Sequence, residues 1–303
     1  KNKVHLIWLI TLIIISLDLI FEYFSGQNIL GFSSPMKGRL SGFLGNELKI
    51  GHLYLGFFII CYVTFFKLTK NYFLLTLFII FGIFISLIIG ERANFLRFFA
   101  ISLIFFLFFE KKNFRIKILF SLFAFLITFV AINFNYEYKK RFYGQLIEPI
   151  IKSKSLMDML NNTVYGANYN RGIQIFKKNQ FFGVGINNFR IESGKEIYSN
   201  KKLKFNDNGA STHPHQIHIE FLSETGIFGY LSFLIFMIIS IFFSFKNFIK
   251  NRDLYVFASL LFFIFILLPI IPTGSFFTTF AATIFWINYG LMINESNNLF
   301  IKK

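Results

Sequence analysis

Residues 213–229 read His-Pro-His-Gln-Ile-His-Ile-Glu-Phe-Leu-Ser-Glu-Thr-Gly-Ile-Phe-Gly. They end the only long polar segment of the chain and begin a long apolar one. Three of the five histidines and two acidic side chains therefore stand where a polar loop meets an apolar run. We expect this stretch to join a loop to a membrane helix and to carry the chemistry of the protein.

The composition around this stretch indicates a membrane protein. Hydrophobic residues make up 55% of the 303 residues, and the mean hydropathy is +0.58. They come in runs of about 18–20, the length that crosses the hydrocarbon core of a bilayer at 1.5 Å per residue. The pattern predicts an all-α polytopic membrane protein and excludes a soluble globular domain. The single Cys61 excludes an internal disulfide framework.

Eight apolar spans are predicted, five before the long polar segment and three after it. They cover approximately residues 4–22, 50–66, 72–90, 94–110, 115–133, 216–245, 254–271 and 274–293. The chain then divides into residues 1–133 with the first five helices, a large loop at 134–215, and residues 216–303 with the last three. All three parts are expected to form one domain.

Basic residues in the short connections predict the orientation in the membrane. They all fall on one side, which the positive-inside rule makes cytoplasmic. These residues are Lys1, Lys3, Lys67, Lys70, Lys111, Lys112, Arg115, Lys117, Lys246, Lys250, Arg252, Lys302 and Lys303. The loop 134–215 is then expected on the outer side. Its own lysines do not oppose this, because long translocated segments escape the rule.

Two local features stand out within the large loop. Tyr169 to Asn179 has the spacing of a short amphipathic helix. Gly183-Val184-Gly185 follows it, but no strand precedes this turn and no third glycine follows it, so it fails as a dinucleotide-binding fingerprint. We interpret it as a turn that pins neighbouring aromatic residues to the membrane surface.

Three arginines on the expected outer side are candidates for binding phosphate, because a guanidinium grips phosphate bidentately. Arg92 lies in a turn so short that it must stay at the membrane surface, Arg171 opens the loop helix, and Arg39 follows the first span. The alternatives to phosphate binding are that these arginines extend to lipid headgroups or are ordinary surface charges. The residues alone leave both interpretations open.

The histidines suggest a general base. Pro214 suits the first turn of a helix, so Thr212 or His213 should cap that helix and His215 should lie in its first turn. The helix dipole there favours the neutral imidazole, which can take a proton from a hydroxyl. An interfacial hydrogen-bonding role is the alternative. A zinc site from His213, His215 and His218 is disfavoured, because their spacing lacks the i, i+4 pair of His-Glu-x-x-His.

Several of these motifs together resemble the bacterial O-antigen ligase and polymerase superfamily. His215-Gln216, followed by nine residues and Gly226-Ile227-Phe228-Gly229, is similar to the ligase signature His-[Asn/Ser/Gln]-x9-Gly-x-x-Gly. Arg92–Leu96 resembles the Arg-x3-Leu element of these proteins. The order of the motifs and their expected side of the membrane also agree.

Further parts of the chain share this resemblance. Arg171–Phe176 and Phe182–Phe189 resemble the part of the large loop before the histidine, and Gly38–Asn46 is similar to an upstream Arg-x-x-Gly-x-x-Gly-Asn stretch. Glu91 and Glu47 depart from the family pattern, which favours a small residue and a proline there. Such ligases carry more spans before the loop, so the chain, which starts with lysine, is expected to lack N-terminal helices.

The resemblance implies a glycosyltransferase of GT-C-like architecture. Its donor would be a glycan on an undecaprenyl-diphosphate-type lipid. Arg92 and Arg171 would bind the diphosphate and stabilise it as the leaving group. His215 would deprotonate the acceptor hydroxyl, which attacks with inversion, and Arg39 is a further phosphate candidate. The implied partners are this donor, an acceptor (glycan, lipid A-core or protein) and the bilayer. No metal, cofactor or nucleic acid is expected, and the active site would face the periplasm from the inner membrane.

The acceptor separates the alternatives within the superfamily. A lipid A-core sugar makes a ligase, a glycan repeat makes a polymerase, and a protein hydroxyl makes an oligosaccharyltransferase. A solute transporter is the alternative from a different class. It would need ionisable residues along a polar path through the spans, and Asp18 and Glu22 are the acidic candidates. A scaffold protein would leave the arginines and histidines unexplained.

Overall fold

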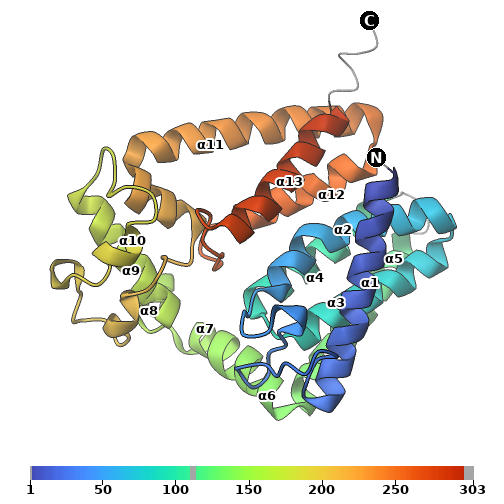
Figure 1. Ribbon diagram of the computed structural model, residues 1–303, viewed down its shortest axis with the longest axis horizontal. Helices are drawn as coiled ribbons and strands as arrows, with labels where there is room; N and C mark the ends of the chain where they lie inside the picture. The colour runs from blue at the N-terminus through green and yellow to red at the C-terminus, as the bar shows by residue number, and fades with distance from the viewer. Residues whose placement is uncertain (1, 110–113, 297–303) are drawn as a thin grey trace, which may run out of the picture. The chain divides into compact units, whose positions relative to one another are not determined.

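The computed structural model describes residues 2–109 and 114–296 (Figure 1). All regular elements within these residues are helices, which confirms the predicted all-α class of polytopic membrane protein. Five residues of the predicted basic connections lie outside the described residues: Lys1, Lys111, Lys112, Lys302 and Lys303.

A helix occupies each of the eight predicted spans. They are α1 (Asn2–Ser25), α2 (Ile50–Thr69), α3 (Tyr72–Ile89), α4 (Arg92–Phe108), α5 (Phe114–Phe134), α11 (Ile217–Asn251), α12 (Leu254–Ile266) and α13 (Thr279–Ser296). Among the described residues, five of these helices are long and apolar enough to cross a membrane: α1, α2, α3, α5 and α11. Of the other three, α4 has 17 residues and α12 has 13, and the apolar part of α13 covers Thr279–Ile293.

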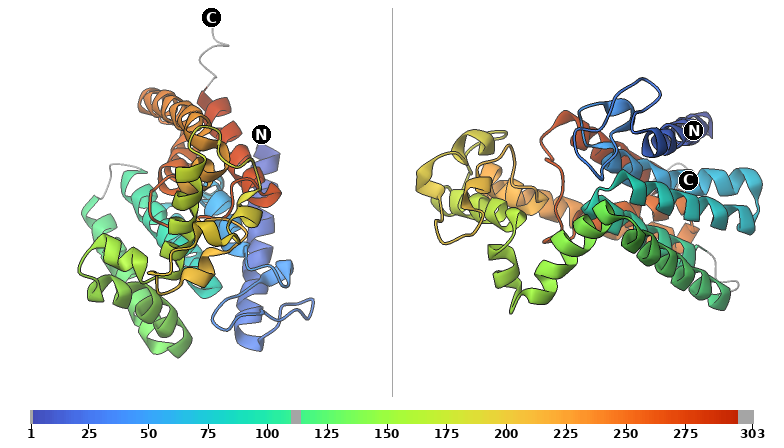
Figure 2. Two further views of the ribbon diagram at one scale, coloured as in Figure 1. Left: turned by 90° about the vertical axis from the view of Figure 1, so that its left-hand side faces the viewer. Right: turned by 90° about the horizontal axis from the view of Figure 1, so that it is seen from below.

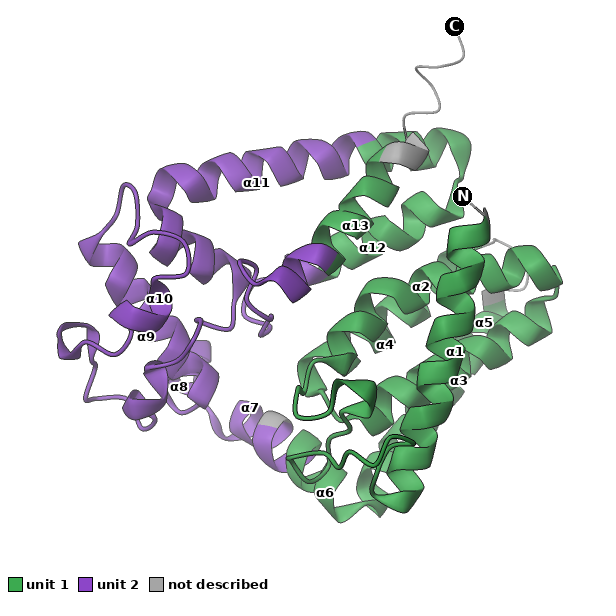
Figure 3. Ribbon diagram, in the orientation of Figure 1, with its two compact units in different colours: residues 1–142, 244–265, 284–303 green, residues 143–243, 266–283 purple. Residues whose placement is uncertain are grey.

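The chain forms two compact units (Figure 3). Unit 1 comprises residues 1–142, 244–265 and 284–303, and unit 2 comprises residues 143–243 and 266–283. In unit 1, α2 contacts α1, α3 and α4, and 67% of its apolar window is buried, against 17% for α5. The helix α2 is therefore the centre of this unit. The apolar side chains of α5 face outward. Such exposure is unfavourable in water but carries no such cost in the hydrocarbon core of a membrane.

The large loop folds into short helices. They are α6 (Tyr136–Lys139), η2 (Lys140–Ile147), α7 (Glu148–Lys152), α8 (Leu156–Asn161), α9 (Val164–Lys178), α10 (Phe189–Glu192), η3 (Glu196–Tyr198) and η4 (Asn206–Gly209). The predicted loop helix is α9, which starts earlier than Tyr169 because Thr163 Oγ1 accepts a hydrogen bond from Gly166 N at 3.1 Å. Ile175, Phe189 and Tyr198 form a buried apolar cluster of unit 2.

The helix α11 is broken near its start, so the predicted span is not one continuous helix. Gly226 has φ 68° and ψ −170°, values that are essentially restricted to glycine. At this break the loop docks on the helix through its main chain, with Val184 N bonded to Ser223 O at 3.0 Å and Ile227 N to Gln180 O at 2.8 Å. Figure 2 shows α9 and α10 beside this end of α11.

Candidate functional site

His215 lies in a turn before α11, not in the first turn of the helix as predicted. The helix begins at Ile217, and the φ of His215 is 55°, a left-handed value that few residues other than glycine adopt. The His215 carbonyl accepts a hydrogen bond from Thr273 N at 2.8 Å, and its ring lies 5.6 Å from the Tyr165 ring. A contact from a distant part of the chain therefore holds this backbone conformation.

Gln216 caps α11 in place of the predicted Thr212 or His213. Its Oε1 accepts hydrogen bonds from His218 N at 2.7 Å and Ile219 N at 3.1 Å. These N–H groups belong to the first turn, where the helix itself supplies no acceptor. His215 precedes this cap and therefore lies outside the helix. The turn, and not helical geometry, sets the orientation of the His215 imidazole.

The three histidines do not gather as a metal-ligand set. The rings of His213 and His215 lie 3.9 Å apart. His218 points elsewhere, with Nε2 at 2.8 Å from Leu267 O and Nδ1 at 3.2 Å from Tyr230 Oη. Within the described ranges, no three His, Cys, Asp or Glu side chains are placed to share a metal ion.

Residues 267–276 form a segment that we call the clamp, because it holds the turn of His215 against α9 and α11. Ile270 O accepts a hydrogen bond from Tyr169 Oη at 2.7 Å. Ser275 Oγ and Phe276 N both donate to the carboxylate of Glu220, the latter at 2.7 Å. With Thr273 bonded to His215, the clamp links both helices to the candidate base.

Glu220 is a further candidate residue of this site, which the sequence pattern did not single out. Its side chain is 1% exposed and supplies both carboxylate oxygens to the clamp. The available signal was an acidic residue one turn into an otherwise apolar helix, where an unsatisfied carboxylate is costly. We assign it a positioning role, since it acts on His215 through the clamp.

Arg171 anchors the end of the large loop. Its Nη1 donates to Lys195 O at 3.2 Å, and its Nη2 donates to Asn206 O at 3.2 Å and Asn206 Oδ1 at 3.3 Å. The side chain is only 5% exposed. Burial lowers the pKa of the guanidinium, and Asp207 raises it in part. An arginine stays charged in proteins, so a cation is held inside the loop.

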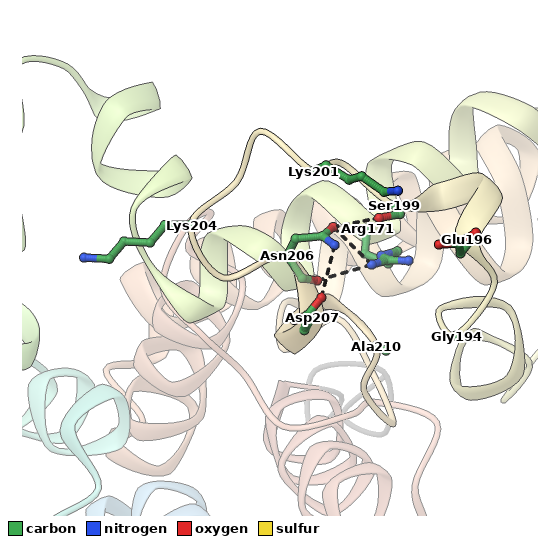
Figure 4. Close-up of a pocket in the computed structure, with 9 residues that line it drawn as sticks. All are labelled: Arg171, Gly194, Glu196, Ser199, Lys201, Lys204, Asn206, Asp207 and Ala210. Carbon is green, nitrogen blue, oxygen red and sulfur yellow. Dashed lines mark hydrogen bonds between the residues drawn. The ribbon is translucent and has the colours of Figure 1, made fainter.

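A cavity of about 590 Å³ lies over Arg171 (Figure 4). Lys201 and Ser199 lie near the guanidinium in this view, whereas Lys204 extends away from it. The lining combines cationic side chains with carboxylates and neutral polar groups, so it offers both donors and acceptors to a hydroxyl-rich ligand. It consists of Arg171, Gly194, Glu196, Ser199, Lys201, Lys204, Asn206, Asp207 and Ala210.

His215 does not line this cavity, but the two are joined through α9. Gly172 follows Arg171 on that helix and packs against the turn of His215. A Cβ at Gly172 would come within 2.4 Å of Ile219 Cγ2 and 3.4 Å of Pro214 Cβ. The helix α9 therefore carries the cation on its cavity side and contacts the histidine turn through the adjacent glycine.

Replacing Arg171 by lysine should damage the loop nearly as much as replacing it by alanine. A lysine cannot bridge both Lys195 O and Asn206, and a buried carbonyl left without a donor costs about 1–3 kcal/mol. We expect both variants to expose residues 194–210 to limited proteolysis and to lose activity. Arg190→Lys, at an exposed arginine of α10, is the matched control. Wild-type protease resistance in Arg171→Lys would contradict the anchoring role.

Arg39 is paired with the acidic residue that departs from the family pattern. Its Nη2 contacts Glu91 Oε1 and donates to Leu48 O at 2.6 Å. The other oxygen of Glu91 accepts from Asn94 Nδ2. A Cβ at Gly51 would overlap the same carboxylate at 2.2 Å, so the neighbouring helix makes room for it. This geometry neutralises Arg39 and favours a structural role over phosphate binding.

Glu91→Gln should therefore destabilise unit 1. The two side chains are 17% and 8% exposed, and removing one partner of a buried pair costs about 3 kcal/mol. Thermal unfolding in detergent measures this loss. In the double variant Arg39→Met with Glu91→Gln, part of the stability should return because no unpaired charge remains. If Glu91→Gln unfolded at the same temperature as the wild type, the ion pair would contribute nothing to the stability of unit 1.

Arg92 starts α4 and is packed into a turn built from main-chain contacts. Its Nη1 donates to Arg141 O at 3.2 Å, and Arg141 Nη2 in turn donates to Gly90 O at 3.2 Å. Gly90 has φ 75°, and a Cβ there would lie 2.1 Å from Gly38 O. Arg92 and Arg39 belong to unit 1, whereas Arg171 and His215 belong to unit 2.

The ionisable residues of the early helices have structural partners. Asp18 Oδ1 accepts from Ile29 N at 2.8 Å, and the Glu22 carboxylate accepts from Ser41 N at 3.1 Å and Gly42 N at 2.7 Å. They hold the loop after α1. The buried Arg97 donates through Nε to a main-chain carbonyl of α12 at 3.0 Å. These contacts explain the acidic residues without a transport path.

Comparison with known proteins identifies the family of the chain's central part. Residues 74–234, just over half of the chain, match the family model described as O-Antigen ligase. Arg92, Arg171 and His215 lie within the matched segment, and Arg39 lies outside it. No curated protein and no solved structure shows significant similarity to the chain.

Proposed function

The chain belongs to the O-antigen ligase family, and from this premise we propose that it is a glycosyltransferase acting on a lipid-linked glycan. The donor is a glycan on an undecaprenyl-diphosphate-type carrier. The acceptor is a hydroxyl group presented at the periplasmic face of the bacterial inner membrane. The observation that carries the proposal is the placement of His215 in a turn held by the clamp, within the matched segment.

His215 acts as the general base in this reaction. The imidazole takes the proton from the acceptor hydroxyl as its oxygen attacks the anomeric carbon. The bond from that carbon to the phosphate oxygen breaks, and the lipid diphosphate leaves from the opposite face. The new glycosidic bond therefore has the inverted configuration. The proton passes from the imidazole to water.

Arg92 and Arg171 stabilise the diphosphate as negative charge grows on it. A guanidinium carries five N–H donors, so Arg171 can bind a phosphate oxygen while keeping its contacts to Lys195 and Asn206. Arg39 contributes less, because Glu91 already compensates its charge. No residue role in this mechanism requires a metal ion or a nucleotide.

A transfer assay with the purified protein in lipid vesicles tests the proposal. A lipid diphosphate-linked glycan serves as donor, and a lipid A-core, a glycan repeat and a serine-containing peptide serve as acceptors. We expect transfer to one of these acceptors, in the presence of a metal chelator, with inversion at the anomeric carbon. The preferred acceptor distinguishes a ligase from a polymerase or a protein oligosaccharyltransferase. Retention of configuration, or no transfer to any acceptor, would contradict the proposal.

A further inference from the structure

The large loop carries an exposed apolar tip. Phe181, Phe182 and Ile186, which we call the aromatic tip, are 62%, 77% and 58% exposed. Side chains of this size gain free energy when they leave water, and two adjacent exposed phenylalanines at a loop turn are unusual on a water-facing surface.

The aromatic tip is held in its exposed position by main-chain contacts. Gly183 N bonds to Asn179 O at 3.0 Å, and Gly185 N bonds to Glu224 O at 2.8 Å. The Glu224 carboxylate also accepts from Asn187 N at 2.7 Å. Gly183 has φ 66°, and a Cβ there would lie 2.4 Å from the Glu224 carbonyl carbon. This docking fixes the tip against α11, so its exposure is a property of the fold.

The aromatic tip continues the apolar surface of a membrane span. The rings of Phe181 and Phe182 lie 5.9 and 5.7 Å from the ring of Phe228, which is itself 55% exposed. Phe228 begins an exposed apolar face of α11, a helix long and apolar enough to cross the membrane. That face continues through Leu231, Ile235, Ile238, Ile239 and Phe242.

Basic side chains flank the aromatic tip. Lys177 lies in the last turn of α9, four residues before Phe181, and Arg190 follows the tip in α10; both side chains are exposed. Apolar residues such as phenylalanine beside lysine or arginine are typical of segments that lie in the membrane interface, where the rings enter the boundary between headgroups and acyl chains and the cations contact lipid phosphates.

We propose that the aromatic tip inserts into the boundary between headgroups and acyl chains of the bilayer, with Lys177 and Arg190 at the lipid phosphates. The tip is connected to the buried cluster of unit 2 through Val184 and Phe189. Insertion therefore sets the depth of the large loop, and of the helix α9 that carries Arg171, relative to the membrane. The proposal concerns a lipid contact and does not depend on the transfer reaction.

Spin labelling measures the insertion directly. The only native cysteine, Cys61, is buried, so Cys61→Ala provides a background for single labels at Phe182→Cys and Ile186→Cys. Ile239→Cys on the exposed face of α11 is the lipid reference, and Asn208→Cys at the exposed η4 is the water reference. The protein is reconstituted in vesicles of phosphatidylethanolamine and phosphatidylglycerol. Power saturation then measures how accessible each spin label is to oxygen, which concentrates in lipid, and to a water-soluble nickel chelate.

We expect the labels at 182 and 186 to resemble the lipid reference, with greater accessibility to oxygen than to the nickel chelate. The label at 208 should show the opposite ratio. A water-like ratio at 182 and 186 would overturn the proposal. So would low accessibility to both reagents, because that result would place the aromatic tip against protein. A second label at Ile239→Cys in the same variant detects unfolding. In an unfolded variant this label would no longer be more accessible to oxygen than to the nickel chelate.

Discussion

His215→Asn should reduce glycan transfer by about 100- to 10,000-fold, the usual contribution of a general base. Asparagine removes the base but tolerates the left-handed backbone that His215 adopts at φ 55°. His215→Ala should show a similar catalytic loss with an added backbone cost. The initial rate of transfer from the lipid-linked donor measures the effect, and donor binding should change little. Wild-type activity in His215→Asn would remove His215 from the mechanism.

The neighbouring histidine provides the matched control for this prediction. His213 has its ring 3.9 Å from that of His215, yet we expect His213→Asn to retain most of the activity. The initial rate of transfer measures both variants. A loss in His213→Asn as large as that in His215→Asn would contradict the distinct role of His215.

Gly226→Ala should separate the large loop from α11. At φ 68° and ψ −170° an alanine is strained, and its Cβ would lie 2.3 Å from Phe181 O. The combined cost is about 3 kcal/mol or more, because the strain alone reaches 1–3 kcal/mol and the clash must be relieved by moving the loop. We expect a lower unfolding temperature, proteolysis at residues 180–189, and loss of transfer.

Gly290→Ala is the control for this substitution. Gly290 lies within α13, and a Cβ there would meet no atom within 4 Å. Alanine is favoured over glycine inside a helix by up to about 1 kcal/mol, so this variant should be as stable as the wild type or more so. If Gly226→Ala were equally stable, the break in α11 would not depend on glycine.

Some residue roles were visible only in part from the sequence. Glu91 was recognised as a departure from the family pattern, but its partner Arg39 is 52 positions away and is identified by the ion pair. Glu220 stands out in the sequence only as an acidic residue within an apolar helix. Its positioning role depends on the hydrogen bonds that Ser275 and Phe276 donate to its carboxylate. In each case the decisive contact is long-range, and no local pattern encodes it.

The amino-acid pattern was sufficient to predict the all-α membrane class, the positions of eight helices and the family motifs. These depend on local quantities: the length of apolar runs, the composition of turns and the spacing of a few residues. The left-handed turn of His215 before the helix and the break at Gly226 within residues 213–229 became visible in the folded chain. Both features depend on hydrogen bonds that Thr273 and the loop at 180–185 make to this stretch from distant positions in the chain. Those bonds override the helical preference of the residues themselves.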